Sequence, residues 1–128
     1  MNKNIVLDLE QIKVIERLIA LVAKAGLINL DITDIQKLLD HSKKLTYKSA
    51  VIQKATKEDV EKSGLLCDEL HHAHKYLINI ESGNDMSLAD IDAIAGAFRD
   101  FEGRALFAFG TSFDEFKTDF LVELFIVE

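Results

Sequence analysis

The sequence predicts an α+β fold, a two-layer domain in which one mixed four-stranded sheet is packed with helices. Two observations lead to this prediction. Segments whose apolar residues recur every three or four positions are typical of helices, and shorter segments rich in alternating, β-branched or aromatic residues are typical of strands. In chain order they give helix, helix, strand, helix, strand, helix, strand, strand. A chain of 128 residues can bury a core, so we expect one domain over residues 1–128.

The first helix is predicted over Ile12–Ala25, with Asp8 as a candidate N-cap. Its apolar surface extends almost all the way round. Such a helix is either buried on several sides or lacks a partner. Charged residues within it argue against a membrane span; they are Lys13, Glu16, Arg17 and Lys24.

A short loop then leads into a second helix, predicted from Ile32 to His41. Gly26 is suited to end the first helix, and Asp31 is a good N-cap for the second. Asp34 falls in the first turn, where a negative charge suits the helix dipole. Two carboxylates three residues apart therefore share one side of a helix start. They either serve only as caps or hold a water or a cation against a phosphate.

The middle of the chain predicts a strand from Leu45 to Lys54 and a helix capped by Thr56 that ends near Ser63-Gly64. Lys75–Ile80 is a second strand, followed by a turn at Gly83.

The last third begins with a helix start at Ser87, with Asp90 three residues on, and this helix stops near Gly103. Leu106–Gly110 is apolar enough for a buried strand. Phe120–Val127 is predicted as the final strand, and Asp114–Lys117 as a hairpin connection into it.

Composition narrows the class of partner and the compartment. The net charge of −7 argues against nucleic acid, since phosphate binding needs a basic face. A single cysteine and the lack of an N-terminal signal pattern favour a reducing compartment, so we expect the cytoplasm.

A cysteine and three histidines lie within eight residues, at Cys67, His71, His72 and His74. Spacings of three and four would suit zinc on a helix. The pattern matches no known zinc site, and we favour exposed histidines that titrate near neutrality. We therefore predict no metal ligand in this chain.

The run Gly26-Leu27-Ile28-Asn29-Leu30-Asp31, with Asp34 three residues on, resembles the synergy loop of FtsZ, the bacterial tubulin. Segments 76–88 and 106–115 also resemble the strand, glycine turn and capped helix, and then the penultimate strand and turn, of the FtsZ C-terminal domain. The resemblance covers nearly the whole chain. It implies a remnant of the central helix at 1–25, the synergy loop at 26–34 and the α+β body at 35–128.

The resemblance also implies a function in trans. Asp31 and Asp34 would orient and polarise the water that attacks the nucleotide of a neighbouring subunit, and Asn29 would contact that nucleotide. The chain has no glycine-rich phosphate loop, so it should not bind a nucleotide alone. GTP and magnesium would stay on the partner, an FtsZ-like subunit or nucleotide-binding domain of the cell-division cytoskeleton. An isolated domain would cap or slow filament assembly.

Two other functions stay open. The spare apolar face of the first helix would suit a non-catalytic module that self-associates or binds another protein. A small enzyme related to chorismate-mutase-type trimers is disfavoured, because no arginine cluster or nucleophile–histidine pairing stands out.

Overall fold

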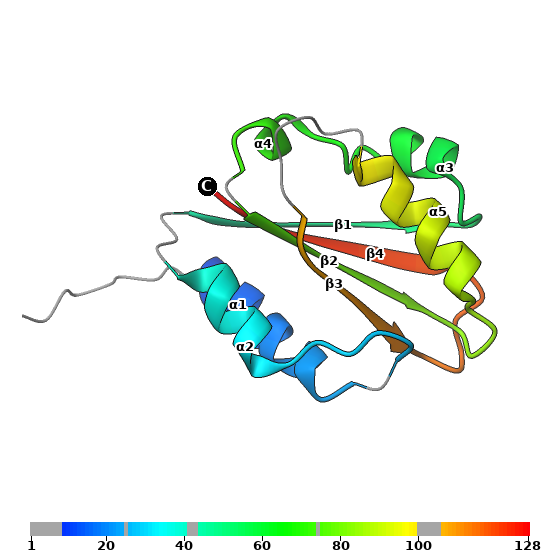
Figure 1. Ribbon diagram of the computed structural model, residues 1–128, viewed down its shortest axis with the longest axis horizontal. Coiled ribbons are helices and arrows are strands. Elements are labelled where there is room, and N and C mark those ends of the chain that lie inside the picture. Colours follow the sequence, from blue (N-terminus) through cyan, green and yellow to red (C-terminus); the bar gives the residue numbers. More distant parts are fainter. Residues whose placement is uncertain (1–8, 25, 41–43, 74, 100–105) are drawn as a thin grey trace, which may run out of the picture.

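The computed structural model describes residues 9–24, 26–40, 44–73, 75–99 and 106–128, with no description of the side chains of 106–108. Its helices are α1 (Leu9–Val22), α2 (Ile32–Leu39), α3 (Lys57–Lys62), α4 (Asp68–His71) and α5 (Leu88–Arg99). Its strands are β1 (Leu45–Ile52), β2 (Lys75–Ser82), β3 (Leu106–Phe113) and β4 (Phe120–Val127) (Figure 1).

The four strands form one mixed sheet in the order β1-β4-β2-β3. β4 is antiparallel to both of its neighbours, whereas β2 and β3 are parallel. The predicted α+β class and mixed four-stranded sheet are thus confirmed.

The predicted hairpin at Asp114–Lys117 is wrong, because β2 lies between β3 and β4. The connection instead crosses the end of β2. Asp114 N donates to Ser82 O at 2.9 Å, and Ser82 Oγ donates to Asp119 O at 2.6 Å. A Cβ added at Gly83 would overlap the Lys117 carbonyl, so the crossing needs a residue without a side chain there.

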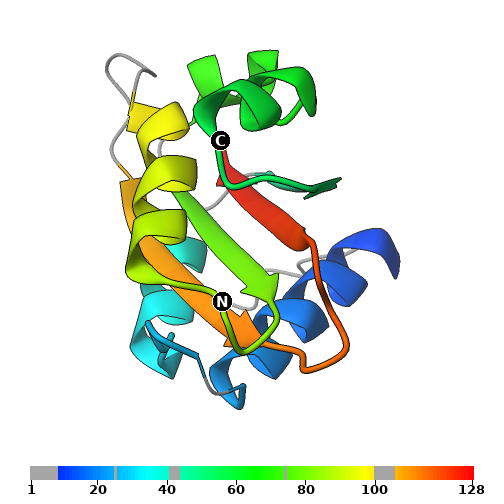
Figure 2. The same cartoon turned by 90° about the vertical axis from the view of Figure 1, so that its right-hand side faces the viewer.

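Helices cover both faces of the sheet, so the domain has three layers and not the two that the sequence predicted (Figures 1 and 2). α1 and α2 lie on one face, which we call the α1 face, and α3, α4 and α5 lie on the other, the α5 face. The two faces have separate apolar clusters. Adjacent residues of β4 show the division, since Leu124 belongs to the cluster of the α5 face and Phe125 to that of the α1 face.

Several element boundaries differ from those predicted. α1 begins earlier, at Leu9, and β2 and β3 run two and three residues past their predicted ends. The short helix α4 was not predicted. The predicted caps and stops at Asp8, His41 and Gly103 lie outside the described residues.

Candidate functional site

The loop between α1 and α2 is anchored on the outer edge of β3. Thr111 N donates to Ile28 O, and Ile28 N donates to Thr111 Oγ1, both at 2.8 Å. β3 is the last strand in the sheet order, so its outer backbone groups are available to the loop. An edge strand thus holds the loop in place through one backbone–backbone bond and one bond to a side-chain hydroxyl.

Two glycines allow this close approach. A Cβ added at Gly26 would overlap the Thr111 carbonyl, and one added at Gly110 would lie 2.5 Å from Leu30 Cγ. Leu30 is itself buried, in the cluster of the α1 face. The loop and the strand can therefore approach closely because each has a glycine at the contact.

Asp31 and Asp34 form a capping box at the start of α2. Asp31 Oδ1 accepts hydrogen bonds from Thr33 N at 2.8 Å and Asp34 N at 3.1 Å, and also from the Thr33 hydroxyl. Asp34 Oδ2 accepts from Asp31 N at 3.0 Å. The capping role foreseen for Asp31 is confirmed.

The capping bonds use one oxygen of each carboxylate. Within the described part of the chain, Asp31 Oδ2, Asp34 Oδ1 and Asn29 Nδ2 have no hydrogen-bond partner. Asn29 Oδ1 accepts from Gly26 N at 3.1 Å, which fixes the amide. Asn29 and Asp31 are exposed and Asp34 is half-buried. The structure thus brings the three predicted residues together on the surface.

Hydrogen bonds from Thr33 and Asp34 hold the pKa of Asp31 below its usual value. This carboxylate is therefore anionic near neutral pH. Leu27, before the three residues, and Ile32, between Asp31 and Asp34, are 44% and 49% exposed. Exposed apolar side chains therefore lie next to the exposed carboxylate of Asp31.

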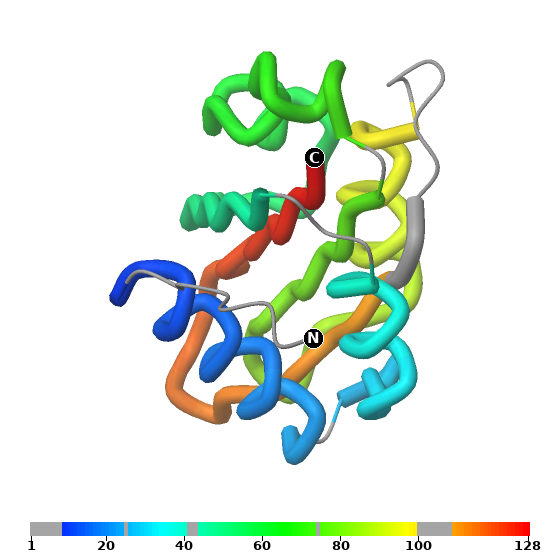
Figure 3. The backbone as a smooth tube through the Cα atoms, turned by 90° about the vertical axis from the view of Figure 1, so that its left-hand side faces the viewer, coloured from blue at the N-terminus to red at the C-terminus, as the bar shows by residue number. Residues whose placement is uncertain are grey.

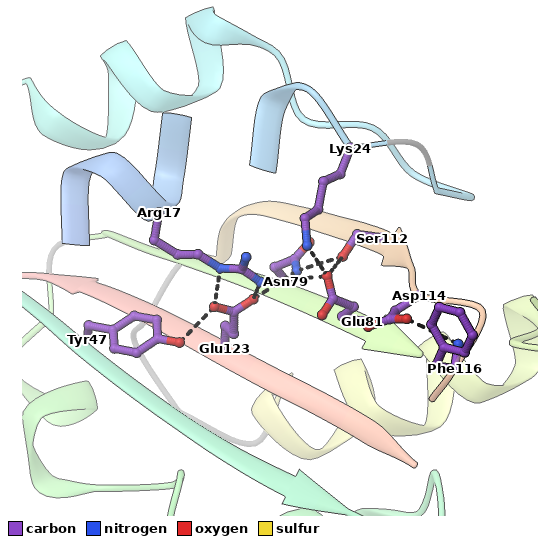
Figure 4. A network of polar contacts seen from close by, with 9 residues as sticks. All are labelled: Arg17, Lys24, Tyr47, Asn79, Glu81, Ser112, Asp114, Phe116 and Glu123. Atoms are coloured by element: carbon purple, nitrogen blue, oxygen red, sulfur yellow. Dashed lines mark hydrogen bonds and ion pairs between the residues drawn. The ribbon is translucent and has the colours of Figure 1, made fainter. Parts of the chain in front are cut away.

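A second polar cluster lies buried between α1 and the sheet (Figure 4). Glu123 of β4 is 1% exposed and accepts two bonds from Arg17, from Nε at 2.7 Å and Nη2 at 2.5 Å. Tyr47 donates to the same carboxylate at 2.7 Å and Asn79 at 3.2 Å. Burial, followed by this hydrogen bond, raises the pKa of Tyr47 to about 12.

Glu81 of β2 is the second buried carboxylate, 4% exposed. It accepts from Lys24 at 2.5 Å and from Ser112 at 3.0 Å. Burial raises the pKa of Glu81, but these hydrogen bonds and the positive charges of Lys24 and Arg17 outweigh burial and leave the pKa below its usual value.

These ion pairs attach α1 to the sheet just before the loop begins. Arg17 lies in α1 and pairs with Glu123 of β4, whereas Lys24 follows the helix end at Val22 and pairs with Glu81 of β2. Lys24 is two residues from Gly26, and β3 holds Ile28. The loop is therefore fixed from both sides, and the buried network is what positions the end of α1.

The sequence patterns did not indicate this network. One signal was present, since Glu123 is the only charged residue in the otherwise apolar run 120–127. Its partners come from positions 17, 47 and 79, which only the folded topology brings together.

The described residues of the cysteine–histidine cluster do not meet at a metal position. Cys67 precedes α4, with His71 at the end of that helix and His72 as its C-cap, while His74 lies outside the described residues. Among the described residues, no three Cys, His, Asp or Glu side chains are placed to hold a metal ion. Burial raises the pKa of the Cys67 thiol. None of the described helices combines the length and the apolar character needed to cross a membrane.

No protein-family model and no curated protein matches the sequence. Solved structures do match. An FtsZ from M. jannaschii, solved as an empty dimer, has a TM-score of 0.73 and 22% identity, over 93% of this chain and 37% of its own. A mutant FtsZ from that organism has a TM-score of 0.71 and 21% identity, over 96% of this chain and 42% of its own.

TubZ from Bacillus thuringiensis serovar israelensis, solved as GDP-form protofilaments, has a TM-score of 0.58 and 15% identity, over 81% of this chain and 30% of its own. The chain thus spans well under half the length of each of these proteins. Over that span, this chain has the fold of the C-terminal domain of FtsZ, a tubulin-like fold with TubZ among its structural neighbours.

Proposed function

We propose that this chain acts as the C-terminal part of a tubulin-like cytoskeletal GTPase, whose loop 26–34 completes the GTPase site of a neighbouring subunit. One observation supports this most directly. Asn29, Asp31 and Asp34 each keep a polar atom without a partner in the described structure. Hydrogen bonds between Ile28 and Thr111, and the Lys24–Glu81 ion pair just before the loop, hold the loop in place.

Each side chain has a distinct role in the proposal. A carboxylate and a phosphate repel one another unless a water or a cation lies between them. Asp31 and Asp34 would therefore act on the attacking water, by orienting and polarising it. Asn29, with no charge, would contact the nucleotide. Phosphoryl transfer depends mainly on such positioning and electrostatics. GTP and its magnesium ion remain on the neighbour, and this chain alone does not turn over nucleotide.

The experiment adds the chain to an FtsZ from the organism that carries this sequence, during assembly with GTP. We expect less sedimented polymer, because a docked domain offers no nucleotide face for the next subunit. We also expect a change in GTP turnover. Unaltered polymer and unaltered turnover at a several-fold excess of the chain would rule the proposal out.

Asparagine substitutions separate docking from chemistry. Asp31→Asn with Asp34→Asn removes both charges, and asparagine still caps a helix well. This variant should still reduce the polymer but lose the effect on turnover. The matched control is Asp90→Asn, at the equivalent position of the α5 capping box, where Asp90 accepts from Ser87 N at 3.0 Å. The control should behave like the unaltered chain.

A second function, a self-associating or protein-binding module without a part in GTP hydrolysis, is supported by a different surface. Three large apolar residues of α1 are exposed: Leu9 (68%), Ile12 (39%) and Ile19 (52%). Light scattering distinguishes the two functions. A stable oligomer that ignores GTP-loaded FtsZ, and that Ile12→Glu with Ile19→Glu dissociates, would favour this second function.

A further inference from the structure

Residues from the first turns of α1 and from the start of β1 line a groove. The backbones of these two elements lie side by side in Figure 3. The volume of the groove is about 440 Å³, and a second hollow of about 260 Å³ adjoins it. Lys13, Val14 and Tyr47 line both. The groove lies at the opposite edge of the sheet from the loop 26–34.

One wall of this groove is formed by the start of β1 and the residue before it. Four successive residues, Lys44 to Tyr47, line it, although side chains of successive strand residues point to opposite faces of a sheet. The four residues therefore line the groove along the edge of the strand and not through one face of the sheet. β1 is the first strand in the sheet order, so no described strand pairs with that edge.

The direction of the backbone groups follows from one hydrogen bond. Glu128 N donates to Lys44 O at 3.0 Å, so the carbonyl of Lys44 points toward β4. In an antiparallel pair, alternate residues point toward the partner strand and away from it. Leu45 and Tyr47, which both line the groove, therefore direct their N–H and C=O groups away from β4, toward the open edge. The same alternation directs those of Ser49 and Val51 outward, further along the edge.

The floor of the groove is apolar and its mouth carries positive charge. The adjoining hollow is formed by Val14, the ring of Tyr47 and the side chains of Lys13 and Arg17. Tyr47 is held in place by its bond to Glu123 and by contact with Phe125, whose ring centroid lies 5.0 Å away.

Lys13 and Lys44 are exposed on the two walls, and neither forms an ion pair with a described residue. Glu10 is the one acidic residue in the lining.

We propose that this groove binds an extended, acidic peptide segment of another protein, which adds to the sheet as a fifth strand beside β1. Backbone bonds to Leu45 and Tyr47 would supply affinity without regard to sequence. An apolar side chain in the Val14–Tyr47 hollow and carboxylates beside Lys13 and Lys44 would supply specificity. The positive mouth, in a chain of net charge −7, favours an acidic segment over a basic one.

The experiment uses the whole chain, labelled with ¹⁵N, and a blocked ten-residue peptide of alternating valine and glutamate. We expect the amide signals of Leu45 and Tyr47 to shift, and their hydrogen exchange to slow by at least about tenfold. Two matched peptides test the mode of binding. One has lysine in place of glutamate, and the other has N-methyl groups on alternate residues, which block strand pairing. Neither should bind.

Charge reversal tests whether the two exposed lysines on the groove walls attract the acidic peptide. Lys13→Glu with Lys44→Glu should weaken binding at least about tenfold. The control Lys54→Glu, an exposed lysine beyond the far end of β1, should leave it unchanged. Three results would overturn the proposal: no shift at millimolar peptide, equal binding of the lysine or N-methylated peptide, or shifts along β1 that follow protein concentration alone. The last would assign the edge to a second copy.

Discussion

The two faces of the sheet are held to their helices by different means. On the α5 face, β2 and β4 present an unbroken apolar surface, with Ile78, Ile80 and Leu124 fully buried. On the α1 face the same two strands bury Glu81 and Glu123, paired with Lys24, which follows α1, and with Arg17 of α1. An apolar contact tolerates small sliding, whereas a bidentate arginine pair fixes position and orientation. The α1 face carries the loop 26–34, and on this face the position of the helix on the sheet is fixed by ion pairs.

The largest loss of stability should follow from removing Arg17, the cation that pairs with Glu123 on the α1 face. Arg17→Met leaves Glu123 buried without its bidentate partner, which should lower the free energy of unfolding by about 3–5 kcal/mol. Denaturant titration measures this. The control Arg99→Met breaks an exposed pair with Asp92 and should change stability by less than about 1 kcal/mol.

Arg17→Met with Glu123→Gln should regain a large part of the loss, because no charge is then left unpaired. If the double variant is as unstable as the single one, packing by the arginine side chain, rather than charge, explains the contact.

The α5 face should respond to volume rather than charge. Leu124→Ala, one residue along β4 from Glu123, removes a fully buried side chain and should lower the free energy of unfolding by about 2–5 kcal/mol. We expect the same loss at pH 4 and pH 7. A loss that varies with pH would mean that the two faces are coupled through β4.

A smaller effect on the α1 face is a loss of stability in acid, which we expect from Glu81. The pKa of Glu81 in the folded chain lies below its usual value of 4.5. Its stabilising effect is thus fully present above about pH 4.5 and is lost as the pH falls through the lowered value. Thermal unfolding of Glu81→Gln should therefore depend less on pH below that point. Glu58→Gln, at an exposed glutamate, should keep the slope of the unaltered chain.

The smallest effect concerns the helix starts, where the two faces should behave alike. Asp31 caps α2 on one face, and Ser87 hydrogen-bonds Asp90 N at the start of α5 on the other. Ser87→Ala should lower the free energy of unfolding by about 1 kcal/mol. Asp31→Ala should lower the unfolding temperature as well, and Asp31→Asn, which keeps a capping side chain, should change it little. If Asp31→Ala destabilises the chain far more than Ser87→Ala does, the loop depends on its helix cap as well as on β3.

The comparison also shows which parts of the fold could be predicted from the sequence. Helix caps, strand alternation and the loop motif depend on residues a few positions apart, and the start of α2 and all four strands were found from them. The α1-face network joins Arg17 to Glu123, and the crossing joins Ser82 to Asp119. Those pairs depend on the strand order. The local pattern at Asp114–Lys117 predicted that β3 and β4 pair directly, whereas β2 lies between them.

The place of β4 has a consequence for how the chain is made. Residues 120–127 follow every other strand in the sequence, yet they pair with β1 on one side and β2 on the other. During synthesis β1 and β2 have no strand to join them until this segment leaves the ribosome. The sheet should therefore close late and in one step, and a chaperone that shields β1 and β2 until then would raise the yield of folded protein.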